Sequence, residues 1–141
     1  MIDQEHLKPL YRLFLNCPEL KPSAVAPFAT REDFETLLRD ERTIPALIFN
    51  GNGFLVAGAV ARIDDIGVPA GPRTACLIWI AVRSDVRDEG YGRRALGMVR
   101  ATLKARGVTT LYAWSSSSAQ EFFRQAGFAI GEPRVYVEAA P

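Results

Sequence analysis

Apolar residues recur at helical spacing in two stretches near the start of the sequence. In the first stretch they are Leu7, Leu10, Tyr11, Phe14 and Leu15. In the second stretch they are Phe34, Leu37 and Leu38. Both patterns predict amphipathic helices that bury one face. The first helix should end before Pro18, and the second should begin after Thr30.

The apolar pattern changes to extended runs in the middle of the chain. Ile44 to Phe49 and Phe54 to Ile63 flank an Asn-Gly-Asn-Gly sequence, which predicts a β-hairpin. Glycines and prolines interrupt the segment from Asp64 to Arg73, so we expect a loop there. Thr74 to Val82 is apolar almost throughout, which predicts a strand in the centre of a sheet.

Strands and helices alternate in the last third of the chain. We expect a long helix from about Gly92 to Arg106, a strand from Thr109 to Trp114 and a short helix after Ser118. Phe128 to Ile130 and Arg134 to Glu138 then form two closing strands. The order of elements predicts an α+β fold with three layers, in which helices cover both faces of a mixed, mostly antiparallel central sheet.

Composition narrows the class of protein. A chain of 141 residues with 48% apolar and 23% charged residues fits one globular domain over residues 1–141. A net charge of +1 gives no electrostatic footprint for nucleic acid or an anionic membrane. The sequence starts without a secretory signal, and a lone His6 with two cysteines indicates neither a metal site nor a disulfide framework. We therefore expect a cytoplasmic protein.

The stretch from Val82 to Arg93 joins the central strand to the long helix, and it is the first candidate for a ligand-binding site. Gly90 and Gly92 allow a ligand to approach the backbone closely. The free N–H groups of a helix start, with the positive end of its dipole, form an anion site. Arg87 or Arg93 can add a charge-assisted hydrogen bond. The alternative is a tight turn that needs glycine for geometry alone.

Asp88 and Glu89 act against anion binding. Two unit charges about 4 Å apart repel by about 1 kcal/mol in a water-like dielectric, and by more when desolvated. Several N–H hydrogen bonds outweigh that repulsion only where the carboxylates point to solvent.

A second motif follows at Ser117 to Phe128. With its register set by Gly127 and Phe128, this run resembles Asn-x-x-Ala-x-x-x-Tyr-x-x-x-Gly-Phe. Together with Arg87-x-x-Gly90-x-Gly92, it resembles the GCN5-related N-acetyltransferase (GNAT) family, whose members transfer an acyl group from acyl-CoA to an amine. The resemblance covers about Thr74 to Val137. It implies the acyl-CoA N-acyltransferase-like fold, acetyl-CoA or another acyl-CoA as cofactor, and a small-molecule or protein amine as acceptor that attacks directly in a ternary complex.

The resemblance also implies where the cofactor lies. The backbone at the end of the central strand would pair with the pantetheine arm, and the N–H groups of the glycine turn would hold the pyrophosphate. Ser117 and Phe123 of the second motif would also contact the cofactor. The implied cofactor-binding residues are Ile80, Ala81, Val82, Arg87, Asp88, Glu89, Gly90, Tyr91, Gly92, Arg93, Ser117 and Phe123.

The chain departs from the family pattern at several positions. Ser117 stands where the family often has asparagine, and Phe123 stands where many members carry a tyrosine that protonates the leaving thiolate. Phenylalanine has no proton to give. Asp88 and Glu89 replace the usual glycine and a basic or small residue. The family's usual first strand is missing or very short, which would expose a sheet edge at which a homodimer could form.

Acylation of an amine needs a group that removes a proton and an outlet for the thiolate. The central strand carries no carboxylate, so Asp64 and Asp65 after the hairpin are the candidate bases, and Tyr136 on a closing strand is the candidate acid. The structural alternatives are a solvated turn for Asp64 and an aromatic on a sheet face for Tyr136. Two other readings of the whole chain stay open: a catalytically silent acyl-CoA-binding sensor or partner module, and an unrelated α+β scaffold.

Overall fold

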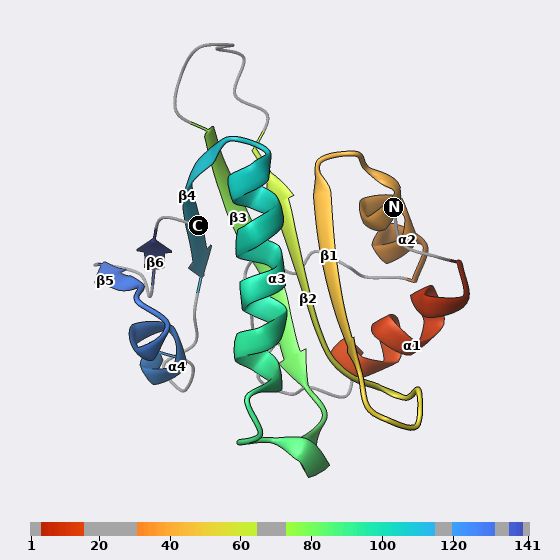
Figure 1. Ribbon diagram of the computed structural model, residues 1–141. Helices are drawn as coiled ribbons and strands as arrows, with labels where there is room; N and C mark the ends of the chain where they lie inside the picture. The colour runs from red at the N-terminus through yellow and green to blue at the C-terminus, as the bar shows by residue number, and fades with distance from the viewer. Residues whose placement is uncertain (1–3, 16–30, 65–72, 115–119, 132–135, 140–141) are drawn as a thin grey trace.

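The computed structural model describes residues 4–15, 31–64, 73–114, 120–131 and 136–139. Figure 1 shows the helices and strands of these ranges. In chain order they are α1 (Gln4–Leu15), α2 (Arg31–Arg39), β1 (Thr43–Phe49), β2 (Leu55–Ile63), β3 (Arg73–Val82), the 3-10 helix η2 (Ser84–Val86), α3 (Tyr91–Ala105), β4 (Val108–Trp114), α4 (Gln120–Gln125), β5 (Ala129–Gly131) and β6 (Tyr136–Ala139). Apart from η2, which lies in a predicted turn, each element lies close to where the sequence pattern predicts it.

The described strands form one mixed sheet in the order β1-β2-β3-β4-β6-β5. The pair β3 and β4 is parallel, whereas the other neighbours are antiparallel. A parallel pair needs a crossover, which α3 provides. In Figure 1, β3 runs down to η2, α3 returns in front of the sheet, and β4 runs down beside β3. The predicted mixed, mostly antiparallel sheet is therefore confirmed.

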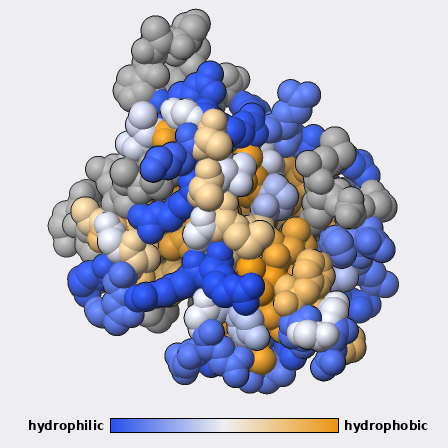
Figure 2. All heavy atoms as spheres, viewed as in Figure 1, coloured by the Kyte–Doolittle hydropathy of each residue, from blue (hydrophilic) through white to orange (hydrophobic). Residues whose placement is uncertain are grey.

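Helices cover both faces of the sheet, and each face has its own core. On one face Leu96, Val99 and Leu103 of α3 pack against β1 to β4. On the other face α1 and α2 pack against β3, with the ring of Phe34 stacked on Trp79 at a centroid distance of 5.4 Å. The outer side of α3 mixes hydrophilic and apolar atoms (Figure 2), as expected for a helix with one buried face.

The hairpin of β1 and β2 closes as its Asn/Gly turn predicts. The side chain of Asn50 accepts hydrogen bonds of 3.0 Å from the N–H groups of Asn52 and Phe54. Gly53 has a φ of +81°, which a glycine adopts without steric cost. β1 ends the described sheet on this side, and Pro45 lies within it. A proline removes a donor from such an edge; the predicted homodimer stays a prediction.

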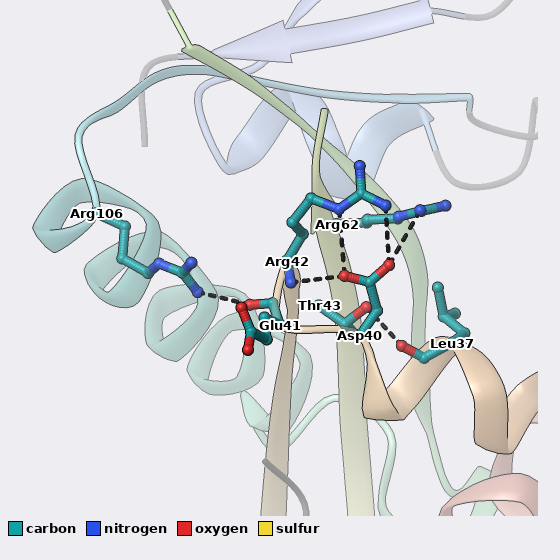
Figure 3. A network of polar contacts seen from close by, with 7 residues as sticks. All are labelled: Leu37, Asp40, Glu41, Arg42, Thr43, Arg62 and Arg106. Atoms are coloured by element: carbon teal, nitrogen blue, oxygen red, sulfur yellow. Dashed lines mark hydrogen bonds and ion pairs between the residues drawn. The ribbon is translucent and has the colours of Figure 1, made fainter. Parts of the chain in front are cut away.

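A polar network fixes the end of α2 to β1 and β2 (Figure 3). Asp40 accepts hydrogen bonds from the Arg42 side chain at 2.9 and 3.2 Å and from Arg62 at 3.1 Å. The hydrogen bond from Arg42 holds the pKa of Asp40 well below its usual range. Buried Thr43 donates 2.7 Å to the carbonyl of Leu37. The network is structural, because each charge in it meets an opposite charge or a backbone group.

No helix in the described ranges has the length and apolar character that crossing a membrane requires. Among the same residues, no group of three or more His, Cys, Asp or Glu side chains is placed to hold a metal ion.

Candidate functional site

The parallel strands β3 and β4 pair only near their starts. Their register partners run from Arg73 and Val108 to Cys76 and Tyr112. Beyond that pair β3 stays joined to β2 as far as Val82, while β4 stays joined to β6. From Cys76 to Val82 the strand extends about 20 Å at a rise of 3.3 Å per residue. We call this divergence of Leu77–Val82 from the end of β4 the β3–β4 fork (Figure 1).

A β-bulge marks the point where the fork opens. Trp79 faces Val60 and Leu77 faces Ala61, so Ile78 has no residue opposite it on β2. The extra residue reverses the alternation of side chains. Leu77 packs into the core under α3, whereas Trp79 packs into the core under α1 and α2. A bulge bends and twists its strand, which accounts for the separation of β3 from β4.

The end of β3 lies beside an uncapped helix start. Gly90 is the N-cap of α3, with a φ of +83° and no side-chain hydrogen bond. The first hydrogen bond of the helix runs from the N–H of Arg94 to the carbonyl of Gly90 at 3.1 Å. The N–H groups of Tyr91, Gly92 and Arg93 therefore have no acceptor within α3, and no acceptor for them occurs elsewhere in the described ranges. This arrangement can bind an anion.

Gly92 brings this helix start against the end of β3 and against α4. A Cβ at Gly92 would lie 3.3 Å from Cγ2 of Val82 and 3.4 Å from Cε2 of Phe122. Contacts at 3.3 Å require a neighbour to move, so a large side chain cannot enter here without displacing Phe122. The glycine is needed for close packing, and that packing sets the free N–H groups beside the fork.

The charged residues of the turn face solvent. Asp88 and Glu89 are both exposed, as are Arg87 and Arg93. The two carboxylates thus meet the condition under which N–H groups can hold an anion despite them. Asp88 has a φ of +69°, a conformation that aspartate tolerates and glycine adopts freely.

Most of the predicted cofactor residues lie together. Ile80, Ala81 and Val82 form the free side of the fork, and the turn with its arginines follows directly. Ile80 and Val82 are partly buried on the α3 face, and Ala81 is buried on the opposite face. On the edge that faces β4 the three residues have no strand partner among the described residues. Backbone groups alternate between the two edges of a strand, and the N–H of Arg83 donates to Val56 of β2. The backbone groups of Ile80 and Val82 therefore face the fork and are available to a ligand amide.

The second motif is placed differently. Phe123 is 4% exposed, and its ring lies 5.1 Å from that of Phe128 and 5.4 Å from that of Phe122. The ring therefore belongs to the core, and its contact with a cofactor stays a prediction. Ser117 lies outside the described residues. Counting the motif back from Gly127 puts its asparagine position at Ser116, also outside them, so the assignment to Ser117 was one residue late.

Asp64 is a bound carboxylate rather than a solvated turn residue. Its Oδ2 accepts a hydrogen bond of 2.6 Å from the hydroxyl of Thr74 and one of 2.9 Å from the hydroxyl of Tyr112. The backbone N–H of Asp64 donates 2.9 Å to the carbonyl of Thr74. Tyr136 begins β6 and pairs with Trp114 of β4; its side chain lies outside what the structure describes.

Sequence reasoning missed Tyr112, which lies at the closed end of the fork. The available signal was strand alternation: Leu111 and Ala113 pack under α3, so Tyr112 faces the other side. Its register partner Cys76 is buried. Burial, with a smaller contribution from the charge of Asp64, raises the pKa of Cys76 to about 12, so the thiol is neutral and is not a nucleophile at neutral pH.

A pocket of about 650 Å³ lies at a different place, beside edge strand β1. His6, Asp40, Pro45 and Arg106 are among the residues that line it. None of the predicted site residues does so, and β2 lies between β1 and strand β3 of the fork.

Comparison with known proteins finds a family that matches this sequence and solved structures that share its fold. The sequence pattern of the acetyltransferase (GNAT) family matches residues 7–128. No curated protein matches the chain significantly in sequence.

Several solved structures share the fold. A GNAT-family acetyltransferase from Staphylococcus aureus has a TM-score of 0.77 at 15% identity, covering 99% of this chain and 95% of that one. The GNAT domain of S. lividans PAT has a TM-score of 0.76 at 16% identity, covering 99% and 88%. The ribosomal-protein-S18-alanine N-acetyltransferase of Escherichia coli has a TM-score of 0.70 at 19% identity, covering 99% and 90%.

Proposed function

The chain belongs to the acetyltransferase (GNAT) family, and from that premise we propose that it transfers an acetyl or other acyl group from acyl-CoA to a primary amine of a small molecule or protein. The observation that carries the proposal is the fork between β3 and β4, which opens toward the uncapped start of α3. An extended chain with amides at one end and a diphosphate at the other fits both features.

The cofactor would bind in two parts. Its pantetheine amides would pair with the backbone of Ile80 to Val82, as an added strand does. Its pyrophosphate would accept hydrogen bonds from the N–H groups of Gly90 to Arg93, at the positive end of the α3 dipole. Arg87 or Arg93, both exposed, would add a charge-assisted bond. The acyl group would then lie near the closed end of the fork.

The reaction would be a direct attack of the amine on the thioester within a ternary complex. A backbone N–H freed by the bulge at Ile78 would polarise the carbonyl and stabilise the oxyanion. Asp64 is the proposed proton acceptor. Tyr136 is the proposed acid, although a thiolate with a pKa near 8 to 9 leaves without obligatory assistance.

A second candidate function is an acyl-CoA sensor that binds the cofactor without turnover. The buried Phe123 favours it, because a phenylalanine there cannot protonate a thiolate.

Thermal unfolding with acetyl-CoA tests the binding step. Ligand at 100 times its dissociation constant adds about 2.7 kcal/mol, or roughly 5 to 10 °C in Tm for a domain of this size. S-acetylpantetheine, which lacks the diphosphate, serves as control and should shift Tm less. No shift with millimolar acetyl-CoA contradicts both functions.

Thiol release from acetyl-CoA then separates the enzyme from the sensor. The assay uses a panel of polyamines, aminosugars, amino-acid amides and lysine peptides. Release that depends on one class of amine supports the enzyme. Binding without release on every class supports the sensor.

A further inference from the structure

Three elements bring polar side chains to the closed end of the fork. Asp64 follows β2, Thr74 begins β3 and Tyr112 comes from β4. Both hydroxyls donate to the same oxygen of Asp64, at 2.6 Å from Thr74 and 2.9 Å from Tyr112. The three residues are far apart in sequence, so the sheet itself assembles them.

The cluster lies where the reacting atoms are expected. Cys76 and Tyr112 form the last pair that joins β3 to β4, so a chain lying in the fork ends against Tyr112. The pyrophosphate site is on the α3 side of the sheet, and Tyr112 faces the side that α1 and α2 cover, because Leu111 and Ala113 pack under α3. An acceptor approaching from that side would meet the phenol beside the thioester.

We propose that Tyr112 is a catalytic residue of the transfer, whose hydroxyl oxygen accepts the proton of the attacking amine while its own proton passes to Asp64. This inference rests on the proposed function, because it needs an acyl-CoA in the fork. A phenol oxygen that donates to a carboxylate still carries two lone pairs. The existing hydrogen bond to Asp64 therefore directs one proton away from the oxygen as another arrives.

The step balances without any further reagent. The nitrogen lone pair of the neutral amine forms the N–C bond, and the carbonyl electron pair moves to oxygen. The amine proton goes to Tyr112, and the Tyr112 proton goes to Oδ2 of Asp64. When the intermediate collapses, the C–S electron pair leaves with sulfur. The thiolate takes a proton from Tyr136 and becomes coenzyme A thiol, and the proton on Asp64 returns through water to Tyr136.

The surroundings of Tyr112 suit this role. The Cys76 thiol opposite Tyr112 is neutral because burial raises its pKa to about 12, so no thiolate repels the charge on Asp64. On the other side β6 presents Glu138 as the register partner of Tyr112. Arg73, next to Thr74, donates to the carbonyl of Arg106 and so turns away from the cluster. Thr74 acts through Asp64 and is a positioning residue.

The test compares Tyr112→Phe, Asp64→Asn and Thr74→Val with wild type. Tyr11→Phe is the matched control, because it removes a phenol from α1 and leaves the ring that packs against Phe34. Acetyl-CoA is titrated first by thermal shift, and its Kd should stay within about twofold in all variants. The rate is then measured with the amine that wild type acetylates fastest in the panel.

We expect kcat to fall about 100-fold in Tyr112→Phe and Asp64→Asn, by less in Thr74→Val, and not at all in Tyr11→Phe. The pH profile gives a readout that a structural role would not move. The pH dependence of kcat should differ between wild type and the two variants Tyr112→Phe and Asp64→Asn, and it should be unchanged in Tyr11→Phe. The solvent deuterium isotope effect on kcat should also decrease in both.

Four other outcomes would overturn the proposed proton transfer from the amine through Tyr112 to Asp64, which we call the relay. Tyr112→Phe with a rate within threefold of wild type excludes the phenol. Loss of the rate in Glu138→Gln but not in Asp64→Asn excludes Asp64 as the proton acceptor. Wild type that binds acetyl-CoA but acetylates no amine excludes the relay and leaves cofactor binding intact. Wild type that does not bind acetyl-CoA overturns the proposed function itself.

Discussion

Cys76 of β3 and Tyr112 of β4 are the last residues that face each other across these two parallel strands. Beyond this pair β3 keeps only β2 as a partner, and β4 keeps only β6. The hydroxyl of Tyr112 donates a 2.9 Å hydrogen bond to Asp64. One residue pair therefore marks the closed end of the fork and connects it to Asp64, the proposed proton acceptor.

Substitutions at two glycines of α3 should distinguish an effect on cofactor binding from an effect on helix stability. Gly92→Trp must displace Phe122 or Val82, which moves the helix start and should abolish the thermal shift with acetyl-CoA. Gly97 has open space around its Cβ position, so Gly97→Ala should stabilise the helix by roughly 0.5 to 1 kcal/mol. It should raise Tm and leave the acetyl-CoA shift unchanged. Normal binding by a folded Gly92→Trp would show that the turn is misassigned.

The charge of the turn should tune affinity for the cofactor. Asp88→Gly removes a negative charge and relaxes a residue with a φ of +69°, so the Kd for acetyl-CoA should fall. A repulsion of about 1 kcal/mol at 4 Å corresponds to a change of about fivefold. Asp88→Asn removes the same charge but keeps a side chain at the positive φ, so it isolates the electrostatic part. Calorimetric titration measures both, and an unchanged Kd in both variants would mean that the anion binds elsewhere.

The pattern of the sequence predicts the elements of the fold, because each signal is local. Asn50 and Gly53 specify the hairpin, and the apolar run before Val82 specifies a central strand. The fork itself could not be predicted in this way. It depends on a bulge at Ile78 and on the register between β3 and β4, which involve contacts between residues far apart in the sequence.

The same distinction applies to the site. The glycine turn was recognisable because Gly90 allows a positive φ and Gly92 allows a close approach, and the two glycines lie only two positions apart in the sequence. Tyr112 gave no such local signal, since its proposed role depends on Asp64 and Thr74, which are close to it only in the folded sheet. Phe123 matched a motif by position, yet its ring packs against Phe128 in the core.

The network at Asp40 should stabilise the fold only while its carboxylate is ionised. The hydrogen bond from Arg42 lowers the pKa of Asp40 below the ordinary 3.8, so the stabilisation is complete above that value and is lost as pH falls toward the lowered pKa. Asp40→Asn should reduce the free energy of unfolding by about 1 kcal/mol at pH 7 and by nothing in strong acid. Urea unfolding at several pH values measures this, with Glu121→Gln in an exposed pair as control; a difference that does not depend on pH would contradict the assignment.

Cys76 should be chemically silent in the folded protein. Burial raises its pKa from 9.0 to about 12, so a thiol reagent at pH 8 should not react until the chain unfolds. A Cys17→Ser background isolates the signal. The unfolded thiol ionises at lower pH than the folded one, so this residue's contribution to stability is present below pH 9 and should decrease as pH rises from 9 to 12. Rapid labelling of the native protein at pH 8 would contradict the burial.

A crystal structure of the protein grown with coenzyme A examines the proposed cofactor site most directly. We expect the diphosphate oxygens within about 3 Å of the N–H groups at Tyr91 to Arg93, and the pantetheine amides paired with Ile80 to Val82, with sulfur pointing toward Tyr112. A diphosphate bound at another surface would contradict the proposed cofactor site. Hydrogen bonds that pair β3 with β4 beyond Cys76 in the presence of ligand would contradict it as well.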